Sequence, residues 1–379
     1  MVDVSVVPPP QPPGAADAHA WRESEPLVPS DKVVARRMAI ISVSGLAASF
    51  LIATLTVLPS AFAIGGPGPT FDTLSSVDGT PLVEISGAPT FPASGELRLT
   101  TVSVSRAGDQ PFTLGRVLAG WASPREYVLP AEYVFGSPDE AKQVKQQAKS
   151  DWITSQESAT VAALEELGTP VPATIRVAEV MDTSNAKGKL QKDDMIVAVN
   201  GKDVVAYGDL SKVLRATTPG GDVAVTVTRA GQRIDYVFAT EDDGTGRAIM
   251  GIYVDPTFDI PIHVTVQIDS VGGPSAGLMF SLAIMDVLTQ KDELRGAKVA
   301  GTGTIDAGGD VGPIGGIRMK LYGAKDAGAK YFLVPVENCE EVAGHVPEGL
   351  SVFSVDTLDD AYNAIEHIGA GDTVNLPTC

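Results

Sequence analysis

The chain has 379 residues, which is enough for two or three domains with a sizeable core. Its composition is 44% hydrophobic and 20% charged with 39 Gly and 27 Pro, which excludes a disordered chain, a collagen and a multi-span channel. The 28 Lys and Arg against 47 Asp and Glu give a net charge of −19, and nucleic acid is not expected as a partner because such a surface repels phosphate backbones.

The N-terminal part predicts a membrane anchor. Residues 1–31 contain the run PPPQPPG and little periodic apolar sequence, which predicts a disordered cytoplasmic tail. Residues 38–60 are predicted to form a transmembrane helix, because the uncharged run MAIISVSGLAASFLIATLTVL would be roughly 31 Å long. Lys32, Arg36 and Arg37 precede this run, so the positive-inside rule places the N-terminus in the cytoplasm and the rest of the chain outside.

A cleaved signal peptide is the alternative interpretation of this segment. Ala61-Phe62-Ala63 matches an A-x-A cleavage site. The leader would nevertheless exceed 60 residues, and its apolar run is longer than the usual ~7–15, so an uncleaved anchor is favoured. Under both interpretations most of the chain is extracytoplasmic. The sequence leaves open whether Cys339 and Cys379 form a disulfide or remain one buried thiol and one tail thiol.

Residues 65–164 are predicted to contain β-strands followed by a long helix. The cluster Gly65–Pro69 is expected to separate the anchor from the folded part. From Phe71 to Val104, apolar and polar residues alternate as in strands. The run SPDE at 137–140 combines a capping box with proline at the first helical position, and the predicted helix ends before Gly168. Its stripe at steps of three and four consists of Val144, Ala148, Trp152, Ser155, Ala159 and Ala162.

Residues 165–242 change to short strand-like runs with one short helix at 208–215. The run LQKDDMIVAVNG at 190–201 resembles the L-x-x-G-D-x-I-x-x-V-N-G run of bacterial PDZ domains, with departures at Asp193 and at Ser184-Asn185-Ala186. The resemblance implies that peptide C-termini or extended segments add to a sheet edge, and that a carboxylate-binding loop lies near Gly168. A small sandwich without a ligand is the alternative.

Residues 246–371 read as mixed α/β. The expected order is a strand in IPIHVTVQI, a buried helix over Pro274–Leu288, a strand pair around Gly308-Gly309 and a second helix over Lys320–Gly328. Two further strands, YFLVPV and LSVFSV, precede a closing helix over Asp359–Ile368.

The run GGPSAG at 272–277 is the first candidate for chemistry. A serine at a helix start lies beside free N–H groups, and those around Gly273 and Ala276 can stabilise a developing oxyanion. The glycines also let a substrate backbone approach closely. Ordinary helix capping by Ser275 is the alternative, so this motif alone is weak.

The run PIGGIRMK ends at Lys320, which lies 45 residues after Ser275. Its neighbours Met319 and Leu321 are apolar, which predicts a lysine at a helix start packed against the core. A desolvated lysine loses its charge more easily and can act as a general base toward a serine hydroxyl. Lys325 is expected at the surface.

Together the two runs resemble the proteolytic domain of Lon-type serine peptidases, whose pattern continues as T-G-x-I…V-x-P-I-G-G-[LI]-x-x-K. The resemblance implies that Ser275 is the nucleophile, Lys320 the base and Thr302 a residue that contacts this dyad. Gly272 departs from the aspartate that the family usually has there. No G-x-x-x-x-G-K-[ST] run occurs, so no ATP-driven module is expected. The expected fold is an α/β Lon-type domain with an inserted PDZ-like β-rich module, preceded by one transmembrane helix.

The resulting hypothesis is an ATP-independent, membrane-anchored serine endopeptidase that cleaves flexible or unfolded extracytoplasmic polypeptides. A catalytically silent PDZ scaffold that tethers secreted proteins is the alternative. No cofactor or metal is expected, because the four histidines show no metal spacing, and a homo-hexamer is implied by the resemblance alone. Turn formation is the expected role of Asp306 and Asp310, with orientation of Lys320 as the second interpretation of Asp306. His263 is a residue that could line the cleft, although a core or edge histidine is the more ordinary interpretation.

Overall fold

The computed structural model describes residues 31–77, 79–105, 112–136, 138–268 and 271–379. The chain forms two compact units, Met1–Leu58 and Pro59–Cys379. The predicted disordered tail lies outside the described residues except for its last residue, Asp31, which begins a helix.

Helix α1 (Asp31–Val57) makes up the described part of the first unit except for Leu58. It has a mean hydropathy of 2.1 over its most apolar window and no residue buried in the protein, so by length and composition it can cross a membrane. It begins before the predicted residue 38 and ends before residue 60. Pro59 explains the end, because proline cannot donate the next helical hydrogen bond.

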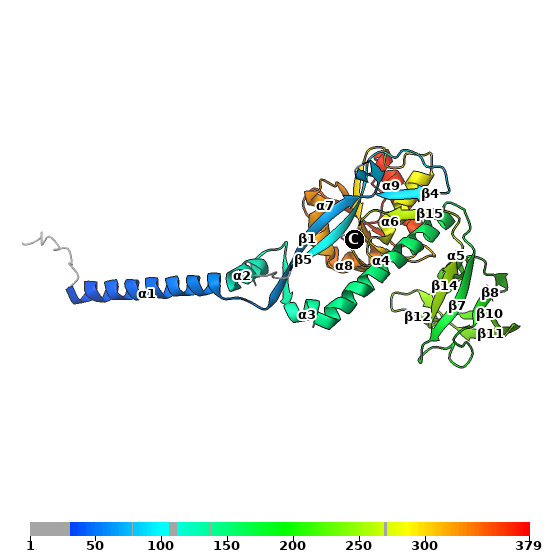
Figure 1. Ribbon diagram of the computed structural model, residues 1–379, viewed down its shortest axis with the longest axis horizontal. Helices are drawn as coiled ribbons and strands as arrows, with labels where there is room; N and C mark the ends of the chain where they lie inside the picture. Colours follow the sequence, from blue (N-terminus) through cyan, green and yellow to red (C-terminus); the bar gives the residue numbers. More distant parts are fainter. Residues whose placement is uncertain (1–30, 78, 106–111, 137, 269–270) are drawn as a thin grey trace, which may run out of the picture. The chain divides into compact units, whose positions relative to one another are not determined.

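The second unit contains a six-stranded mixed sheet in the order β20-β19-β16-β5-β1-β6 (Figure 1). Strand β16 is parallel to both β5 and β19, β19 is parallel to β20, and β1 is antiparallel to β5 and β6. The strands are β1 (Phe62–Asp72), β5 (Glu96–Ser105), β6 (Tyr127–Pro130), β16 (Lys298–Gly301), β19 (Tyr331–Pro335) and β20 (Ser351–Val355). One sheet therefore joins segments from both sides of residues 173–258.

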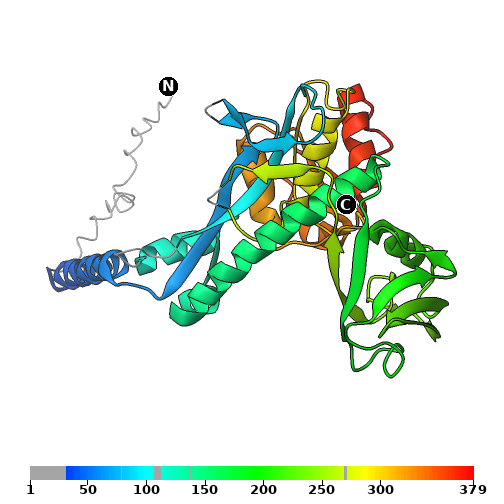
Figure 2. The ribbon, with the colours of Figure 1, turned by 45° about the vertical axis from the view of Figure 1, so that its right-hand side comes forward.

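Helices cover this sheet, and α6 lies at the centre of the core. The side chains of α6 are almost all buried, and Trp152 of α4 meets Phe280 of α6 edge to face at 5.1 Å. Figure 2 shows α4 as the long green helix that crosses this domain. The helices are α2 (Leu114–Ala122), α3 (Ala131–Phe135), α4 (Pro138–Glu166), α6 (Gly277–Leu288), α7 (Ile317–Asp326), the 3₁₀ helix η1 (Val336–Asn338), α8 (Cys339–Val342) and α9 (Leu358–Ala370).

Short strands complete the domain as two-stranded pairs. The pairs are β2 (Ser76–Val77) with β3 (Thr80–Pro81), β4 (Val83–Ser86) with β15 (His263–Val266), and β17 (Thr304–Ile305) with β18 (Val311–Gly312). We call residues 59–166 together with 263–379 the Lon-like domain.

The interpretation of Gly65–Pro69 as a breaker is wrong, because this cluster lies inside β1. The glycines permit close packing there. A Cβ on Gly65 would lie 2.0 Å from the Tyr127 ring, and one on Gly68 would lie 2.8 Å from the backbone carbon of Thr101. The irregular register of β1 against β5 begins at Pro67, where the prolines interrupt the ladder.

The predicted stripe of the long helix is correct only for its second half. Trp152, Ser155, Ala159 and Ala162 are buried, whereas Val144 is exposed. Val144, near the N-terminal end of α4, belongs to none of the hydrophobic core clusters of the described residues.

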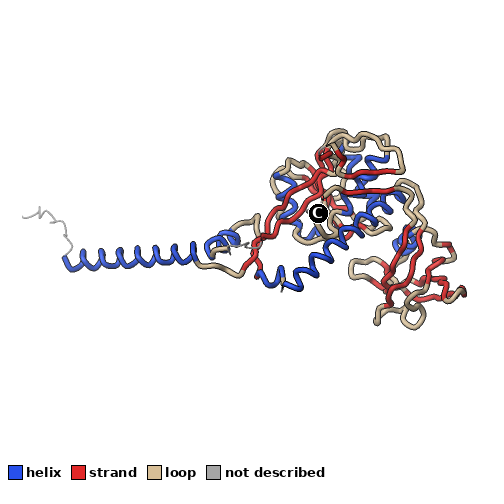
Figure 3. The backbone as a smooth tube through the Cα atoms, in the orientation of Figure 1, coloured by secondary structure: helices blue, strands red, loops and turns tan. Residues whose placement is uncertain are grey.

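Residues 173–258 form a second sheet in the order β11-β10-β8-β7-β14, with β9 beside β8 and helix α5 packed on it. Figure 3 shows that strands predominate in this PDZ-like module, as we call it. Its elements are β7 (Ala173–Val180), β8 (Met195–Val199), β9 (Lys202–Asp203), α5 (Tyr207–Arg215), β10 (Asp222–Arg229), β11 (Gln232–Ala239), β12 (Glu241–Asp242), β13 (Ala248–Ile249) and β14 (Ile252–Phe258).

Two expectations for this module need correction. Its sheet extends to Phe258, beyond the predicted end at 242, because β14 pairs with β7. The expected carboxylate-binding loop should precede the edge strand beside β7. Because that edge strand is β14, the turn that precedes it is at Met250-Gly251 and not near Gly168. The departure at Asp193 is explained by its φ of 69°, a left-handed conformation in which glycine is favoured and Asp is tolerated.

Candidate active site

Ser275 lies in a turn directly before α6. The helix begins at Gly277 with Ala276 as its N-cap, and not at the predicted Pro274. The carbonyl oxygen of Ser275 accepts hydrogen bonds from the Gly303 amide at 3.0 Å and from the Thr302 hydroxyl at 2.9 Å. Two contacts from the end of β16 therefore fix the serine turn.

Lys320 is the fourth residue of α7, which begins at Ile317 and ends at Asp326, earlier than predicted at both ends. The residue is 2% exposed. Its Nζ lies 2.8 Å from Ser275 Oγ and 2.7 Å from Thr302 Oγ1. Burial lowers the pKa of Lys320 to about 7, because the charged ammonium loses its hydration.

Thr302 orders the hydrogen bonds of this group. It follows β16, and its amide donates to the Leu333 carbonyl of β19 at 3.2 Å. Because its hydroxyl proton is directed to the Ser275 carbonyl, its oxygen accepts an N–H from Lys320. This leaves the lone pair of a neutral amine free to face Ser275 Oγ.

Gly273 does not supply the expected oxyanion donor in this structure. Its amide donates to the Ala148 carbonyl of α4 at 2.9 Å. Its φ of 86° does fit the turn, because that conformation favours glycine. Among the described residues, no acceptor meets the amide of Ala276, which lies directly after the serine.

The other candidate side chains lie away from this group. The Asp306 carboxylate accepts from the Gly308 and Asp310 amides, both at 2.9 Å, and thus forms the β17–β18 turn and does not contact Lys320. His263 is exposed on β15, and Lys325 is exposed on α7. No cluster of three or more metal-ligating residues occurs among the described residues.

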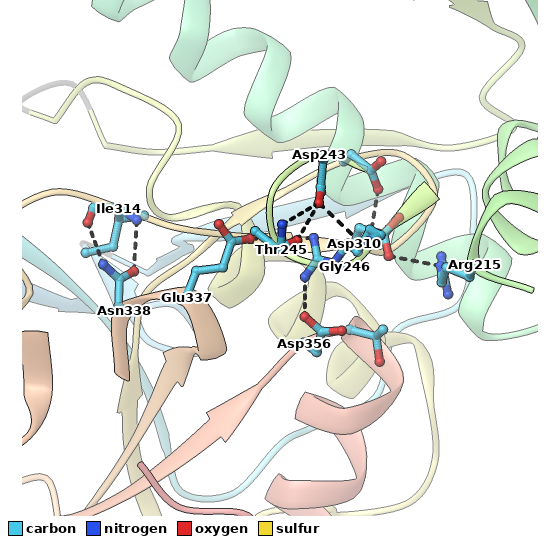
Figure 4. Close-up of polar contacts among 12 residues, drawn as sticks. Arg215, Asp243, Thr245, Gly246, Asp310, Ile314, Glu337, Asn338 and Asp356 are labelled. Atoms are coloured by element: carbon cyan, nitrogen blue, oxygen red, sulfur yellow. Dashed lines mark hydrogen bonds and ion pairs between the residues drawn. The ribbon is translucent and has the colours of Figure 1, made fainter. Parts of the chain in front are cut away.

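Asn338 is a supporting residue that the sequence analysis missed. Its side-chain oxygen accepts from the Ile314 amide at 3.0 Å, and its side-chain nitrogen donates to the Ile314 carbonyl at 2.9 Å (Figure 4). These bonds fix the loop that leads to Lys320. The next residue, Cys339, forms a disulfide with Cys379, with the two Cα atoms 4.9 Å apart. The question left open by the sequence is thereby answered in favour of pairing.

The mixed sheet with the serine turn and the second β-module correspond to two domains of known families. Residues 247–366 match the Lon protease (S16) C-terminal proteolytic domain, and residues 159–228 match the PDZ domain. The chain therefore contains both domains, as the sequence predicted. The first match indicates a serine peptidase.

Curated relatives agree with this assignment. A Lon protease of Lachnoclostridium phytofermentans is 40% identical over 105 residues, covering 27% of this chain and 13% of that protein. A Lon protease of Campylobacter jejuni is 31% identical over 187 residues, covering 44% of this chain and 23% of that protein. A Lon protease of Rickettsia conorii is 30% identical over 199 residues, covering 50% of this chain and 25% of that protein. This chain thus spans a quarter or less of each of these proteins.

Among solved structures, the PDZ domain of an SdrC-like protein from Listeria monocytogenes is similar to 21% of this chain and 85% of that chain. The identity is 17% and the TM-score is 0.21.

Proposed function

We propose that this protein is an ATP-independent, membrane-anchored serine endopeptidase that uses Ser275 and Lys320 as a catalytic dyad. The observation that carries the proposal is the 2.8 Å contact between Ser275 Oγ and the Nζ of a buried lysine. A lysine with a pKa of about 7 is half neutral at that pH, so it is available as a base where an ordinary lysine is charged.

The reaction follows from this arrangement. Neutral Lys320 accepts the Ser275 hydroxyl proton while Oγ attacks the peptide carbonyl carbon, and the resulting ammonium delivers that proton to the leaving amine. Water then attacks the acyl-enzyme, again with Lys320 as the base. The ester bond to Ser275 breaks, the Lys320 ammonium returns its proton to Oγ, and the product leaves with a new C-terminal carboxylate. Thr302 keeps the amine oriented throughout, and the Ala276 amide is the donor that we assign to the developing oxyanion.

Substrates and partners follow from the domain content. As an ATP-independent peptidase, the protein would act on flexible or already unfolded polypeptides. The PDZ module would bind peptide segments at the edge of its sheet that β14 forms. A homo-hexamer remains a proposal from the Lon resemblance, and the mass of the purified full chain in detergent tests it.

We place the catalytic part outside the cytoplasm. The basic residues Lys32 and Arg36 at the start of α1 support this orientation, and the Cys339–Cys379 disulfide supports an oxidising compartment. Protease added to intact cells should digest the C-terminal part, and complete protection of that part would exclude this orientation.

The decisive experiment compares the purified full chain with S275A and K320A on an unstructured protein substrate such as casein. Both substitutions should abolish turnover, whereas K325A, which changes an exposed lysine of the same helix, should leave it intact. No turnover by any variant, or equal turnover by all, would favour the non-catalytic scaffold.

A further inference from the structure

The PDZ-like module has a groove between α5 and β14. The groove is part of a cavity of about 500 Å³, and Leu210, Leu214, Ile252 and Val254 supply its apolar walls. Strand β14 is an edge strand of its sheet, so it can pair with one more extended segment. Ser184 fixes the turn before β14, because its hydroxyl donates to the Met250 carbonyl at 2.9 Å.

Two arginines line the end of the groove at which β14 begins. Arg215 is the last residue of α5, and Arg247 lies in the segment before β14. A segment that pairs antiparallel with β14 ends at this point, so its terminal carboxylate would meet both guanidinium groups. A parallel segment would bring its cationic amino terminus there instead, which the arginines disfavour.

Both arginines already form ion pairs with carboxylates of the Lon-like domain, and Figure 4 shows the Arg215–Asp310 pair. Arg215 Nε lies 2.9 Å from Asp310, and Arg247 forms an ion pair with Asp356 and lies 3.6 Å from Glu337. We call Arg215–Asp310 and Arg247–Asp356 the groove ion pairs. Asp306 also lines the cavity, and Asp243 caps the loop by accepting from the Thr245 amide. The terminal carboxylate of a bound peptide would therefore lie close to several acidic side chains that repel it.

The groove ion pairs lie next to the β17–β18 hairpin, which follows the residues that bind the serine turn. Arg215 also donates to the carbonyl of Gly308 in the β17–β18 turn, and α5 packs so closely there that a Cβ on Gly308 would lie 2.0 Å from Ser211 Oγ. At its other end, the hairpin follows Gly303, whose amide binds the Ser275 carbonyl. A single short hairpin therefore links the groove with the active site.

We propose that a peptide C-terminus entering this groove competes with Asp310 and Asp356 for Arg215 and Arg247. Binding separates the groove ion pairs and loosens the hairpin that supports Ser275. The inference rests on peptide binding by the PDZ module in the proposed function, and it adds that the Lon-like domain opposes this binding. Competition of this kind is reciprocal, so weaker groove ion pairs mean tighter peptide binding.

The test uses the full chain in detergent with S275A as background, so that its result does not depend on proteolysis. The probes are a fluorescein-labelled decapeptide that ends in Val-Leu-Val with a free carboxylate, and the same peptide with a C-terminal amide. D356N and D310N should each bind the acid peptide about fivefold more tightly or better, with no change for the amide. R247Q should bind the acid peptide more weakly than the parent chain does and should leave the affinity for the amide peptide unchanged. D326N, which removes a carboxylate paired with Arg125 elsewhere on the same domain, is the matched control.

A second readout follows the hairpin directly. The Val311 amide donates to the Asp356 carbonyl at 3.0 Å, and the Leu358 amide donates to the Gly309 carbonyl at 2.8 Å. The acid peptide should speed hydrogen exchange at both amides, and the amide peptide should not. Unchanged affinity in D356N and D310N, equal gains for both peptides, or unchanged exchange would each overturn the inference. Loss of proteolysis with these binding effects intact would overturn the proposed function alone.

Discussion

The pH dependence of turnover provides the sharpest test of the dyad. Burial lowers the pKa of Lys320 from 10.5 to about 7, so the folded protein favours the neutral amine. Only that form can accept the Ser275 proton. The rate should therefore rise with pH up to about 7 and level off above it.

The size of this effect follows from the pKa. About a tenth of Lys320 is neutral at pH 6 and about nine tenths at pH 8, so kcat/KM should rise roughly tenfold between these values. Stability should move in the same direction. Between pH 7 and 10.5 the unfolded chain holds a proton on this lysine that the folded chain lacks, so folding is favoured as pH rises. At pH 7 the buried lysine costs about 4 kcal/mol, and K320M should recover part of this.

The assay is kcat/KM for a peptide without titratable side chains, measured from pH 5.5 to 9 on the full chain. Glu165 needs a control, because burial raises its pKa to about 7 as well. E165Q should retain the acidic limb, and K320R should be inactive throughout. A flat profile between pH 6 and 8, or a limb that disappears in E165Q, would refute the assignment of the base to Lys320.

Three further substitutions test other parts of the structure. T302V removes the hydroxyl that orients Lys320 and should lower kcat by about 10- to 100-fold. C339S removes a link between residues 40 positions apart and should lower the free energy of unfolding by about 4 kcal/mol, as measured by denaturant titration under non-reducing conditions. G68A places a Cβ against the facing strand backbone and should cost about 1–3 kcal/mol, seen as a lower Tm.

Matched variants show whether these effects are specific. T304V changes a threonine of the adjacent hairpin strand without touching Lys320 and should retain turnover. G66A introduces a Cβ at an ordinary 3.4 Å contact and should retain the melting temperature. Wild-type protein in reducing buffer should reproduce the loss of stability in C339S. Equal effects in a variant and its control would contradict the corresponding explanation.

The sequence predicts the parts of the fold that local patterns determine. Regular alternation gives β7, β10 and β20, and the apolar run after Pro274 gives the buried helix α6. The serine and lysine motifs also predict two side chains that the structure brings together. Both motifs combine glycine turns with a helix start, and such turns depend on nearby residues.

Non-local packing explains what the sequence does not predict. Gly65–Pro69 has the composition of a linker, yet it forms a strand because Tyr127 and Thr101 pack where side chains would otherwise lie. Likewise, β14 follows the predicted module in sequence and joins its sheet through pairing with β7. The engagement of the Gly273 amide depends on α4, and no motif around the serine contains that information.

The interrupted sheet has a consequence for how activity arises during folding. Helix α7 packs on β1 and β5, and a Cβ on Gly316, the residue before α7, would lie 2.8 Å from Val102 of β5. Until these early strands have docked beside β16, the amine of Lys320 remains hydrated and protonated, and it cannot act as a base. If Lys320 is the base, we expect a newly made chain to remain inactive until strands from the N-terminal part of the domain have docked against α7.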